Sequence, residues 1–401
     1  MNRTVLVAWL CLSLGLTPAA FAWPAEDRAL EGSGPQGLVF DCPAPRVEVL
    51  RNAMTALLIE LDIDRDWVVR TDLPDGRIAY TLDTLPDDTD TLALSRNPRF
   101  RIRDELVQQP SPARRITRVQ TVSRKEILLA MLQSGRTTTM SGAACDLRAL
   151  REHLGLRQNI VAWLERRNWQ FPDGEPARWN ANQWRDGTPL ALSQTELALR
   201  DTFTNEGLYA FGCYTASKIS FAHGVMDYYR RVLNDPVKAG LALARLLRDR
   251  EPLMDIEPPQ AWSFEADFDP GAGLRSGKLL GLIRGVPPRN FIPGDWAYLA
   301  NDDPASRLRS GYEGSNAIYL GRGRFADFYA ESPEGYSFEG KLDEVWQWRN
   351  GVFSRNRDAG RIQPLGPRDY ERLSARPEEG GLLHDLRMTP YFFGWQTLPD
   401  P

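Results

Sequence analysis

The chain has 401 residues, of which 42% are hydrophobic and 25% charged, with 12 Trp, 12 Tyr and 16 Phe. This apolar content is sufficient for the core of one or two domains and excludes a disordered chain. The net charge of -4 arises from 49 basic and 53 acidic residues that are mixed along the chain, so we expect no nucleic-acid partner.

Residues 1–22 have the pattern of a signal peptide. Arg3 provides a charged start, an apolar run extends from Val5 to Leu16, and Ala20 and Ala22 form a cleavage site. The apolar run is shorter than the roughly 20 residues that span a bilayer, and Pro18 follows it. We therefore expect a periplasmic or secreted protein without stable membrane insertion after cleavage.

The region from 23 to 135 is expected to form an N-terminal extension of mixed α+β structure. Residues 23–41 are rich in Gly, Pro and charge, which is typical of a linker or extended arm. From Val47 to Leu61 the apolar residues repeat with helical spacing and predict an amphipathic helix. Short β-prone segments follow at Trp67–Arg70 and Ile78–Thr81.

Several helices are predicted in the middle of the chain. Arg124–Gln133 forms one, and Asp146–Asn168 forms a longer apolar stripe that we expect Gly155 to divide. Ser193 is expected to be the N-cap of a helix that ends near Thr204.

Another long helix is expected to begin at Cys213 and to end near Asn234, where Pro236 blocks its continuation. Three short strands, at Trp296–Leu299, Asn316–Leu320 and Arg324–Tyr329, then indicate an antiparallel sheet. Residues 351–401 are expected to form a tail that wraps around the molecule.

The chain has four cysteines, of which Cys11 lies in the predicted signal peptide. Of the three that remain, two are expected to pair in an oxidising compartment. Cys42 precedes a proline in a turn-like segment, and Cys145 follows a run of small residues before a helix, so we expect these two to form a disulfide. Cys213 is then a free reactive thiol, an intermolecular link or a small buried residue, and the other alternative is that all three are reduced.

Cys213 has the position of a nucleophile. Unpaired N–H groups in the first turn of a helix stabilise a thiolate, and the backbone N–H of Cys213 is a natural oxyanion donor. Gly212 before it permits a tight entry into the helix.

A base for this thiol is harder to identify. The chain has three histidines, His153, His223 and His384. His223 lies ten residues along the same helix, about 15 Å away, so it is expected to be a buried helix histidine without contact to Cys213. The remaining candidates are carboxylates, and Glu313 would share one face of an extended strand with Ser315. The other acidic residues of the strand region are Asp295, Asp302, Asp303 and Asp327.

Four segments resemble the small transglutaminase of bacterial spore coats, a protein-glutamine gamma-glutamyltransferase. Leu156–Ala162 looks like the Leu-Arg-x-Asn-Ile-Val-Ala helix of that family, and Tyr209–Ala216 resembles its Tyr-Ala-Phe-Glu-Cys-x-Thr-Ala nucleophile motif. Gly294–Asn301 resembles its Gly-Asp-x-x-Tyr-x-x-Asn strand, and Gly314–Gly321 its Gly-Glu-Asn-hydrophobic segment. The four segments occur in the family's order.

The resemblance implies an α+β, papain-like (NlpC/P60-like) core, with the nucleophile helix packed on an antiparallel sheet, in a catalytic domain from 136 to 350. It implies that Cys213 attacks a glutamine carboxamide, releases ammonia and holds a thioester until a lysine amine forms an isopeptide bond. The partners would be proteins or peptides that bear Gln and Lys, and no metal or organic cofactor is expected.

The family's helper residues do not carry over. Gly212 and Ser315 stand where the family has glutamates, and the family's histidine falls near Phe328. The resemblance therefore leaves Glu313 or Asp327 as the partner of Cys213, or an activity that is changed or lost. The alternatives are a cysteine amidase or peptidase of cell-wall peptides and a non-catalytic binding protein of the same fold.

Overall fold

The computed structural model describes residues 36–390, except for 86, 111–115, 166, 248–251, 255–278, 327, 330, 331, 333 and 354–357. The predicted signal peptide with Cys11 lies outside the described residues, and so does Asp327. All of the described residues belong to one structural unit.

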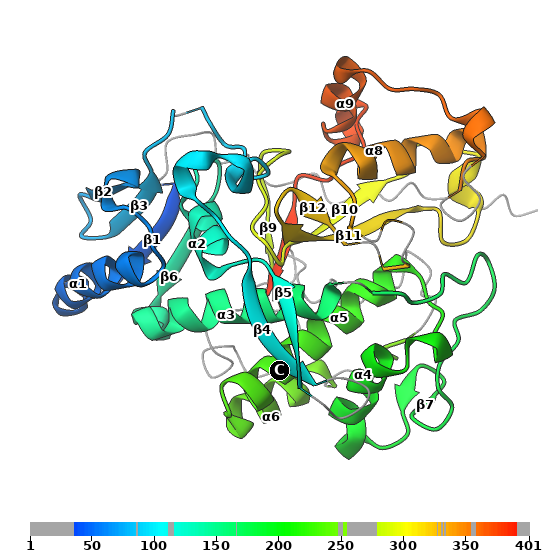
Figure 1. Cartoon of the computed structure of the whole chain (residues 1–401), viewed down its shortest axis with the longest axis horizontal. Helices are drawn as coiled ribbons and strands as arrows, with labels where there is room; N and C mark the ends of the chain where they lie inside the picture. Colours follow the sequence, from blue (N-terminus) through cyan, green and yellow to red (C-terminus); the bar gives the residue numbers. More distant parts are fainter. Residues whose placement is uncertain are drawn as a thin grey trace, which may run out of the picture. The chain divides into compact units, whose positions relative to one another are not determined.

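Four strands near the N-terminus form a sheet in the order β2-β3-β1-β6. They are β1 (Gly37–Asp41), β2 (Val68–Asp72), β3 (Ile78–Leu82) and β6 (Thr137–Ser141). β1 pairs with β3 in the antiparallel sense and with β6 in the parallel sense. Figure 1 shows β1, β2 and β3 beside the first helix.

The start of β1 differs from the sequence prediction of a linker or arm over 23–41. Leu38, Val39 and Phe40 are fully buried in the central strand of this sheet. Three consecutive apolar residues are typical of a strand that is covered on both faces, and here they outweigh the Gly- and Pro-rich composition of the surrounding segment.

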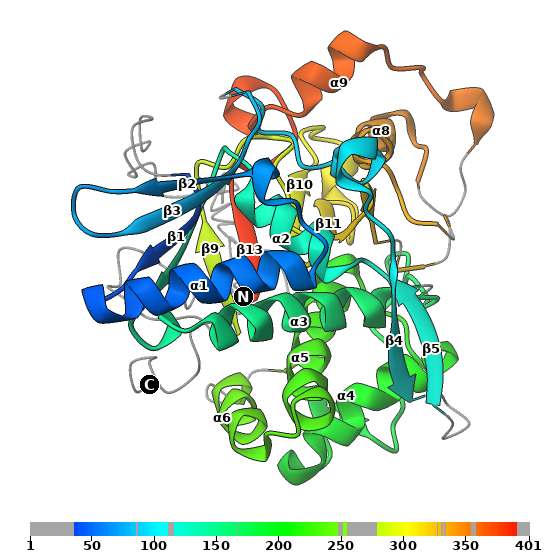
Figure 2. The same ribbon diagram turned by 60° about the vertical axis from the view of Figure 1, so that its left-hand side comes forward.

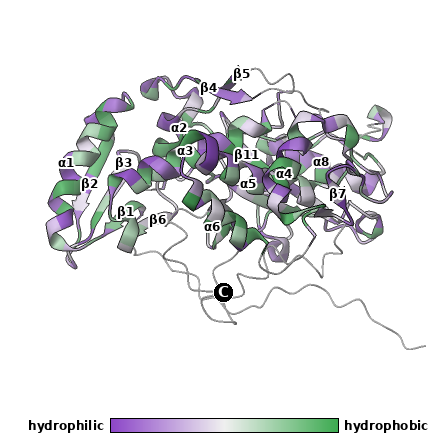
Figure 3. Cartoon of the chain, turned by 90° about the horizontal axis from the view of Figure 1, so that it is seen from below, coloured by the Kyte–Doolittle hydropathy of each residue, from purple (hydrophilic) through white to green (hydrophobic). Residues whose placement is uncertain are grey.

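Helix α1 (Ala44–Glu60) confirms the predicted amphipathic helix, with Val47, Leu50, Met54, Leu57 and Leu58 buried. Figure 3 shows apolar and polar positions side by side around it, and Figure 2 shows it beside α3 (Leu147–Leu164), which it contacts. Among the described helices, none combines the length and apolar content that a bilayer crossing requires.

Gly155 does not divide the helix in which it lies, contrary to the sequence prediction, because α3 runs without interruption from Leu147 to Leu164. A Cβ at this glycine would lie 2.6 Å from the hydroxyl oxygen of Tyr228. The residue therefore permits a close approach between helices. Helix α2 (Arg124–Leu132) precedes it as predicted, and β4 (Glu105–Pro110) and β5 (Ile116–Thr121) form a hairpin.

The following helices are α4 (Thr195–Thr204), α5 (Cys213–Asp227) and α6 (Pro236–Leu246). Ser193 is not the N-cap of α4 as predicted, because it lies within a 3₁₀ turn and Gln194 takes the cap position. α5 begins at the predicted residue and continues as a π-helical turn, Tyr228–Val232. A short pair, β7 (Trp184–Arg185) and β8 (Thr188–Pro189), precedes α4.

The second large sheet is antiparallel, as predicted, with the order β12-β11-β10-β13-β9. Its strands are β9 (Leu280–Ile283), β10 (Trp296–Ala300), β11 (Gly314–Gly321), β12 (Arg324–Phe325) and β13 (Arg387–Pro390). β13 lies inside the sheet, so the C-terminal region is not only a surface tail. Its Arg387 side chain is buried, and the carbonyl groups of residues 287 and 288 accept hydrogen bonds from it.

The second sheet contacts helices from two parts of the chain. α5 contacts β11, and Tyr214 and Phe221 of α5 pack on the ring of Trp296, with centroids 5.5 Å and 5.9 Å away. α8 (Phe338–Gln347) contacts β10, β11 and β12, beside which it lies in Figure 1, and α9 (Pro367–Leu373) packs against α8. Phe338, Leu342 and Val345 of α8 belong to one buried apolar cluster with residues of this sheet. These contacts hold the start of α5 and one face of α8 near β11.

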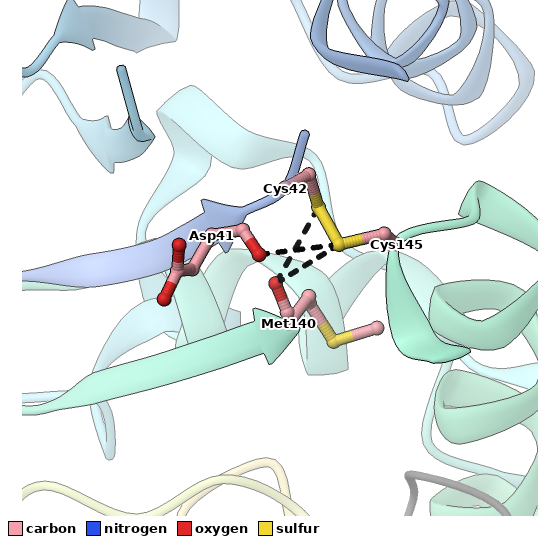
Figure 4. The surroundings of a disulfide bond; sticks show 4 residues. All are labelled: Asp41, Cys42, Met140 and Cys145. Carbon is pink, nitrogen blue, oxygen red and sulfur yellow. Dashed lines mark hydrogen bonds between the residues drawn. A yellow bond between two sulfur atoms is a disulfide. The ribbon is translucent and has the colours of Figure 1, made fainter. Parts of the chain in front are cut away.

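The predicted disulfide between Cys42 and Cys145 is confirmed (Figure 4). It joins the residue after β1 to the residue that precedes the N-cap of α3, and the Cα atoms are 5.6 Å apart. The bridge thus links the N-terminal sheet to a helix that contacts both α5 and β11.

Candidate functional site

Cys213 is the first residue of α5 and the free cysteine among the described residues. Gly212 is the N-cap, with φ of -72° and ψ of 169°. A side chain at Gly212 would meet no atom within 4 Å of its Cβ, so the backbone does not require glycine here, contrary to the tight entry that the sequence suggests.

The sulfur of Cys213 lies at the edge of β11. The backbone N–H of Asn316 donates to Sγ at 3.3 Å, and Nδ2 of the same residue contacts Sγ at 3.6 Å. The thiol in turn lies 3.8 Å from the carbonyl oxygen of Gly314. Nε1 of Trp296 donates to Oδ1 of Asn316 at 2.9 Å, and this bond orients the amide so that its NH₂ group faces the sulfur. The sequence motif contains Asn316 but does not identify this role.

Burial raises the pKa of the Cys213 thiol, while the Asn316 N–H groups and the Lys341 ammonium oppose this shift in part. The net direction is upward, whereas the sequence predicts a stabilised thiolate at the helix start. The difference arises because the strand and the neighbouring helices cover much of the thiol, which is partly buried. Activation of this thiol therefore requires a group that removes its proton.

Cys213 opens into a cavity with largely aromatic walls. Side chains from four parts of the chain meet there: the loop after α3, the start of α5, β11 with the segments that flank it, and α8 with the residue that follows it. The lining residues are Phe171, Cys213, Gly311, Tyr312, Ser315, Asn316, Ala326, Phe328, Tyr329, Lys341, Glu344 and Trp348.

Two of the predicted site residues, Cys213 and Ser315, are brought together in this cavity. Glu313 is not one of the described residues that line it. β11 begins at Gly314, and the carbonyl oxygen of Glu313, directly before the strand, accepts from the N–H of Asn301 at 3.0 Å. Burial raises the pKa of the Glu313 carboxyl, and the backbone N–H groups of Glu313 and Gly311 oppose that shift. The remaining candidate, Asp327, lies outside the described residues.

The three histidines also lie apart from the described lining of the cavity. His153 is buried and accepts a hydrogen bond from Nε of Arg157 at 2.8 Å. His223 is a buried helix histidine, as predicted, and packs between Trp163 and Phe203 with ring centroids 4.4 Å and 4.5 Å away. His384 stacks on Tyr298 at 5.2 Å.

Asp295 is an acidic candidate from the strand region, and its interactions are those of a structural residue. Its carboxylate pairs with Arg136 at 2.7 Å and Arg157 at 2.9 Å, and it accepts from the N–H of Ile292 at 2.8 Å. Burial would raise the pKa of Asp295, but the two guanidinium groups outweigh it and the net pKa is lowered. Asp295 therefore ties the segment before β6 to the turn before β10.

Asp302 and Asp303 also form an ion pair or a hydrogen bond with neighbouring residues. Asp302 pairs with Arg349, and the carboxylate of Asp303 accepts from the N–H of Ser306 at 2.8 Å. Both interactions are typical of loop and turn residues rather than of a catalytic acid.

Lys341 and Glu344 on α8 are cavity residues that the sequence prediction missed. They form an ion pair with side chains only 7% and 8% exposed, and Nζ of Lys341 lies 4.4 Å from the ring centroid of Tyr336. The spacing of three residues places both on one face of the helix. A signal was present in the sequence, because both charges border the apolar stripe of Phe338, Leu342 and Val345.

Comparison with known proteins identifies a family for the central part of the chain. Residues 101–332 match the family of protein-glutamine gamma-glutamyltransferases. Among solved structures, a transglutaminase from Geobacillus stearothermophilus without its C-terminal extension is similar, with 20% identity and a TM-score of 0.38. That match covers 64% of this chain and 100% of the other. No protein with a curated description matches. The family match ends before α8, so Lys341 and Glu344 lie beyond it.

Proposed function

The chain belongs to the protein-glutamine gamma-glutamyltransferase family, and from this premise we propose that it is an exported acyltransferase with Cys213 as its nucleophile. The sulfur attacks the carboxamide carbon of a protein-bound glutamine, the C–N bond breaks, and ammonia leaves. The resulting thioester passes its acyl group to a lysine amine, which forms an isopeptide bond and restores the thiol.

The observation that carries this proposal is the position of Cys213. A free cysteine begins α5, contacts the N–H groups of Asn316 and opens into the cavity. A helix on an antiparallel strand is the arrangement expected of the papain-like core that the resemblance implies. The aromatic walls formed by Phe171, Tyr312 and Trp348 support an amine acceptor, because exclusion of water protects a thioester from hydrolysis.

The disulfide supports export. The bond between Cys42 and Cys145 is stable in an oxidising compartment and is rarely kept in a reducing cytosol. Together with the signal pattern of residues 1–22, it favours a periplasmic or secreted location.

The test is a transamidation assay on the full chain. The protein is incubated with an N-blocked Gln-Gly peptide and a fluorescent primary alkylamine, and the products are followed by mass spectrometry, with Cys213→Ala as the matched variant. We expect amine incorporation and ammonia release in the parent protein and neither in the variant. Glutamate formation without amine incorporation would identify a hydrolase instead. Equal reaction in both proteins, or in neither, would refute the proposal.

A further inference from the structure

We propose that the ion pair of Lys341 and Glu344 on α8 is the proton-transfer partner of Cys213, in place of the histidine and glutamate that this chain lacks at the family's positions. This inference rests on the proposed function of Cys213. Lys341 would be the catalytic group, because it lines the same cavity as the sulfur, and Glu344 a positioning residue that acts through Lys341.

The geometry of the cavity supports this pairing. Cys213, Lys341 and Glu344 line the same cavity from two different elements, α5 and α8. The apolar contacts of Leu342 and Val345 fix α8 against the sheet and direct the charged pair toward the cavity. The polar contacts of the sulfur with described residues are with Asn316 and Gly314, and these groups do not titrate in the range of a thiol.

The pair is deeply buried, as the structural pair of Arg136 and Asp295 is, but unlike that pair it belongs to the described lining of the cavity. Both side chains are less than a tenth exposed, and a buried ion pair is often no more stabilising than apolar residues of similar volume. Each charge also acts on the sulfur, since the Lys341 ammonium lowers and the Glu344 carboxylate raises the pKa of the Cys213 thiol. Both charges therefore belong to the wall of the cavity that also contains the thiol.

Cys213, Lys341 and Glu344 together account for each proton that moves in the reaction. Lys341 passes one of its protons to Glu344 as it takes the proton of the thiol, which leaves a thiolate beside an ammonium. The thiolate attacks the carboxamide carbon, and the leaving nitrogen takes the stored proton through Lys341 and departs as ammonia. In the second half, the proton released by the attacking amine follows the same route and returns to the sulfur when the C–S bond breaks.

The test compares two single variants by a measurement that does not depend on the acyl reaction. The rate of Cys213 alkylation by iodoacetamide is measured against pH by mass spectrometry of the peptide that contains Cys213. In Lys341→Gln we expect the alkylation profile to move to higher pH, with a rate roughly tenfold lower at neutral pH, because the thiolate loses its cation. In Glu344→Gln we expect the profile to move to lower pH, because a carboxylate is removed. Both variants are expected to lose about 100-fold in transamidation rate.

Lys341→Arg separates charge from proton transfer. Arginine keeps the cation but does not give up its proton, so alkylation should stay near that of the parent protein while transamidation falls. Lys238→Gln is the matched control, since Lys238 pairs with Glu152 at 2.6 Å with partly buried side chains and does not belong to the described lining of the cavity. It should change neither measurement.

A structural role for the pair predicts a different result. If both single variants move the alkylation profile in the same direction, or neither differs from Lys238→Gln, the inference is wrong. Should a single variant fail to fold, the double variant Lys341→Gln/Glu344→Gln removes both charges together and must still lose transamidation while its thiol is alkylated. Transamidation that persists in Cys213→Ala would refute the proposed function, and the alkylation profiles would still decide whether the pair acts on the sulfur.

Discussion

Asn316 sets the environment of the sulfur at the scale of single residues. Its side chain accepts from Trp296 and directs its NH₂ group at Cys213. Asn316→Asp would keep the acceptor for Trp296 but place a carboxylate beside Sγ, which raises the pKa of the thiol. We expect alkylation by iodoacetamide at pH 8 to slow by about tenfold, and the thermal unfolding midpoint to fall because the carboxylate is buried without a cation among the described contacts of Asn316. Unchanged alkylation would mean that the side chain of Asn316 does not act on the thiol.

The residues of the site differ in how well the sequence predicts them. Cys213 and the disulfide followed from a count of cysteines and from local turn and helix signals, and both positions are confirmed by the structure. Glu313 was chosen by strand alternation, and it lies directly before β11 without being one of the described residues that line the cavity. The spacing of Lys341 and Glu344 beside an apolar stripe places both on one face of a helix, but the sequence does not reveal that this face meets the cavity, because that depends on how α8 packs against the sheet.

His223 permits a prediction about pH. Burial among aromatic rings lowers its pKa to about 4 from an ordinary value of 6.5, and its Nε2 lacks a hydrogen-bond partner. As the pH falls from 6.5 toward 4, the unfolded chain binds a proton that the folded chain does not, so stability decreases in that range and no further below it. In urea unfolding, the free energy of unfolding of the parent protein should fall between pH 7 and pH 5. That of His223→Phe should fall by about 2 kcal/mol less over the same range. Equal losses would show that His223 is not buried in its neutral form.

At the scale of elements, the contact between α3 and α5 positions the helix that begins at Cys213. Gly224 of α5 faces α3, and a Cβ there would lie 2.6 Å from Cγ1 and 3.0 Å from Cα of Ile160. Gly224→Ala should therefore reduce the free energy of unfolding by about 1 to 3 kcal/mol, although alanine favours helices. Gly240→Ala in α6 is the control, because that position has no atom within 4 Å and is exposed. It should increase the free energy of unfolding by about 1 kcal/mol in the same denaturant measurement.

The elements also differ in how well the sequence predicts them, because some depend on their own residues and others on contacts with distant segments. Long periodic helices such as α1 and the start of α5 were located from their own residues. Gly155 was interpreted as a break because a glycine weakens an isolated helix, whereas the approach of Tyr228 makes it necessary within α3. β13 has four residues and pairs with β9, which lies about a hundred residues earlier, so no local pattern predicts it.

At the scale of the whole molecule, the N-terminal sheet is joined to the rest by the disulfide and by the pairing of Arg136 with Asp295. The disulfide closes a segment with a sequence separation of 103 residues. A closure of this length removes a large part of the conformational entropy of the unfolded chain, equivalent to about 3 to 5 kcal/mol of stability.

The double variant Cys42→Ala/Cys145→Ala tests that contribution. We expect its free energy of unfolding to fall by about 3 to 5 kcal/mol in urea. The native contacts should remain, because β1 and β6 pair along their full length and Arg136 still holds Asp295. Alkylation of Cys213 should therefore keep its pH profile, since the cavity is built from α5, β11, α8 and their flanking segments, to which β1 contributes no lining residue. A changed profile would show that the N-terminal sheet supports the site directly, and unchanged stability would show that the unfolded chain gains little freedom when the bridge is lost.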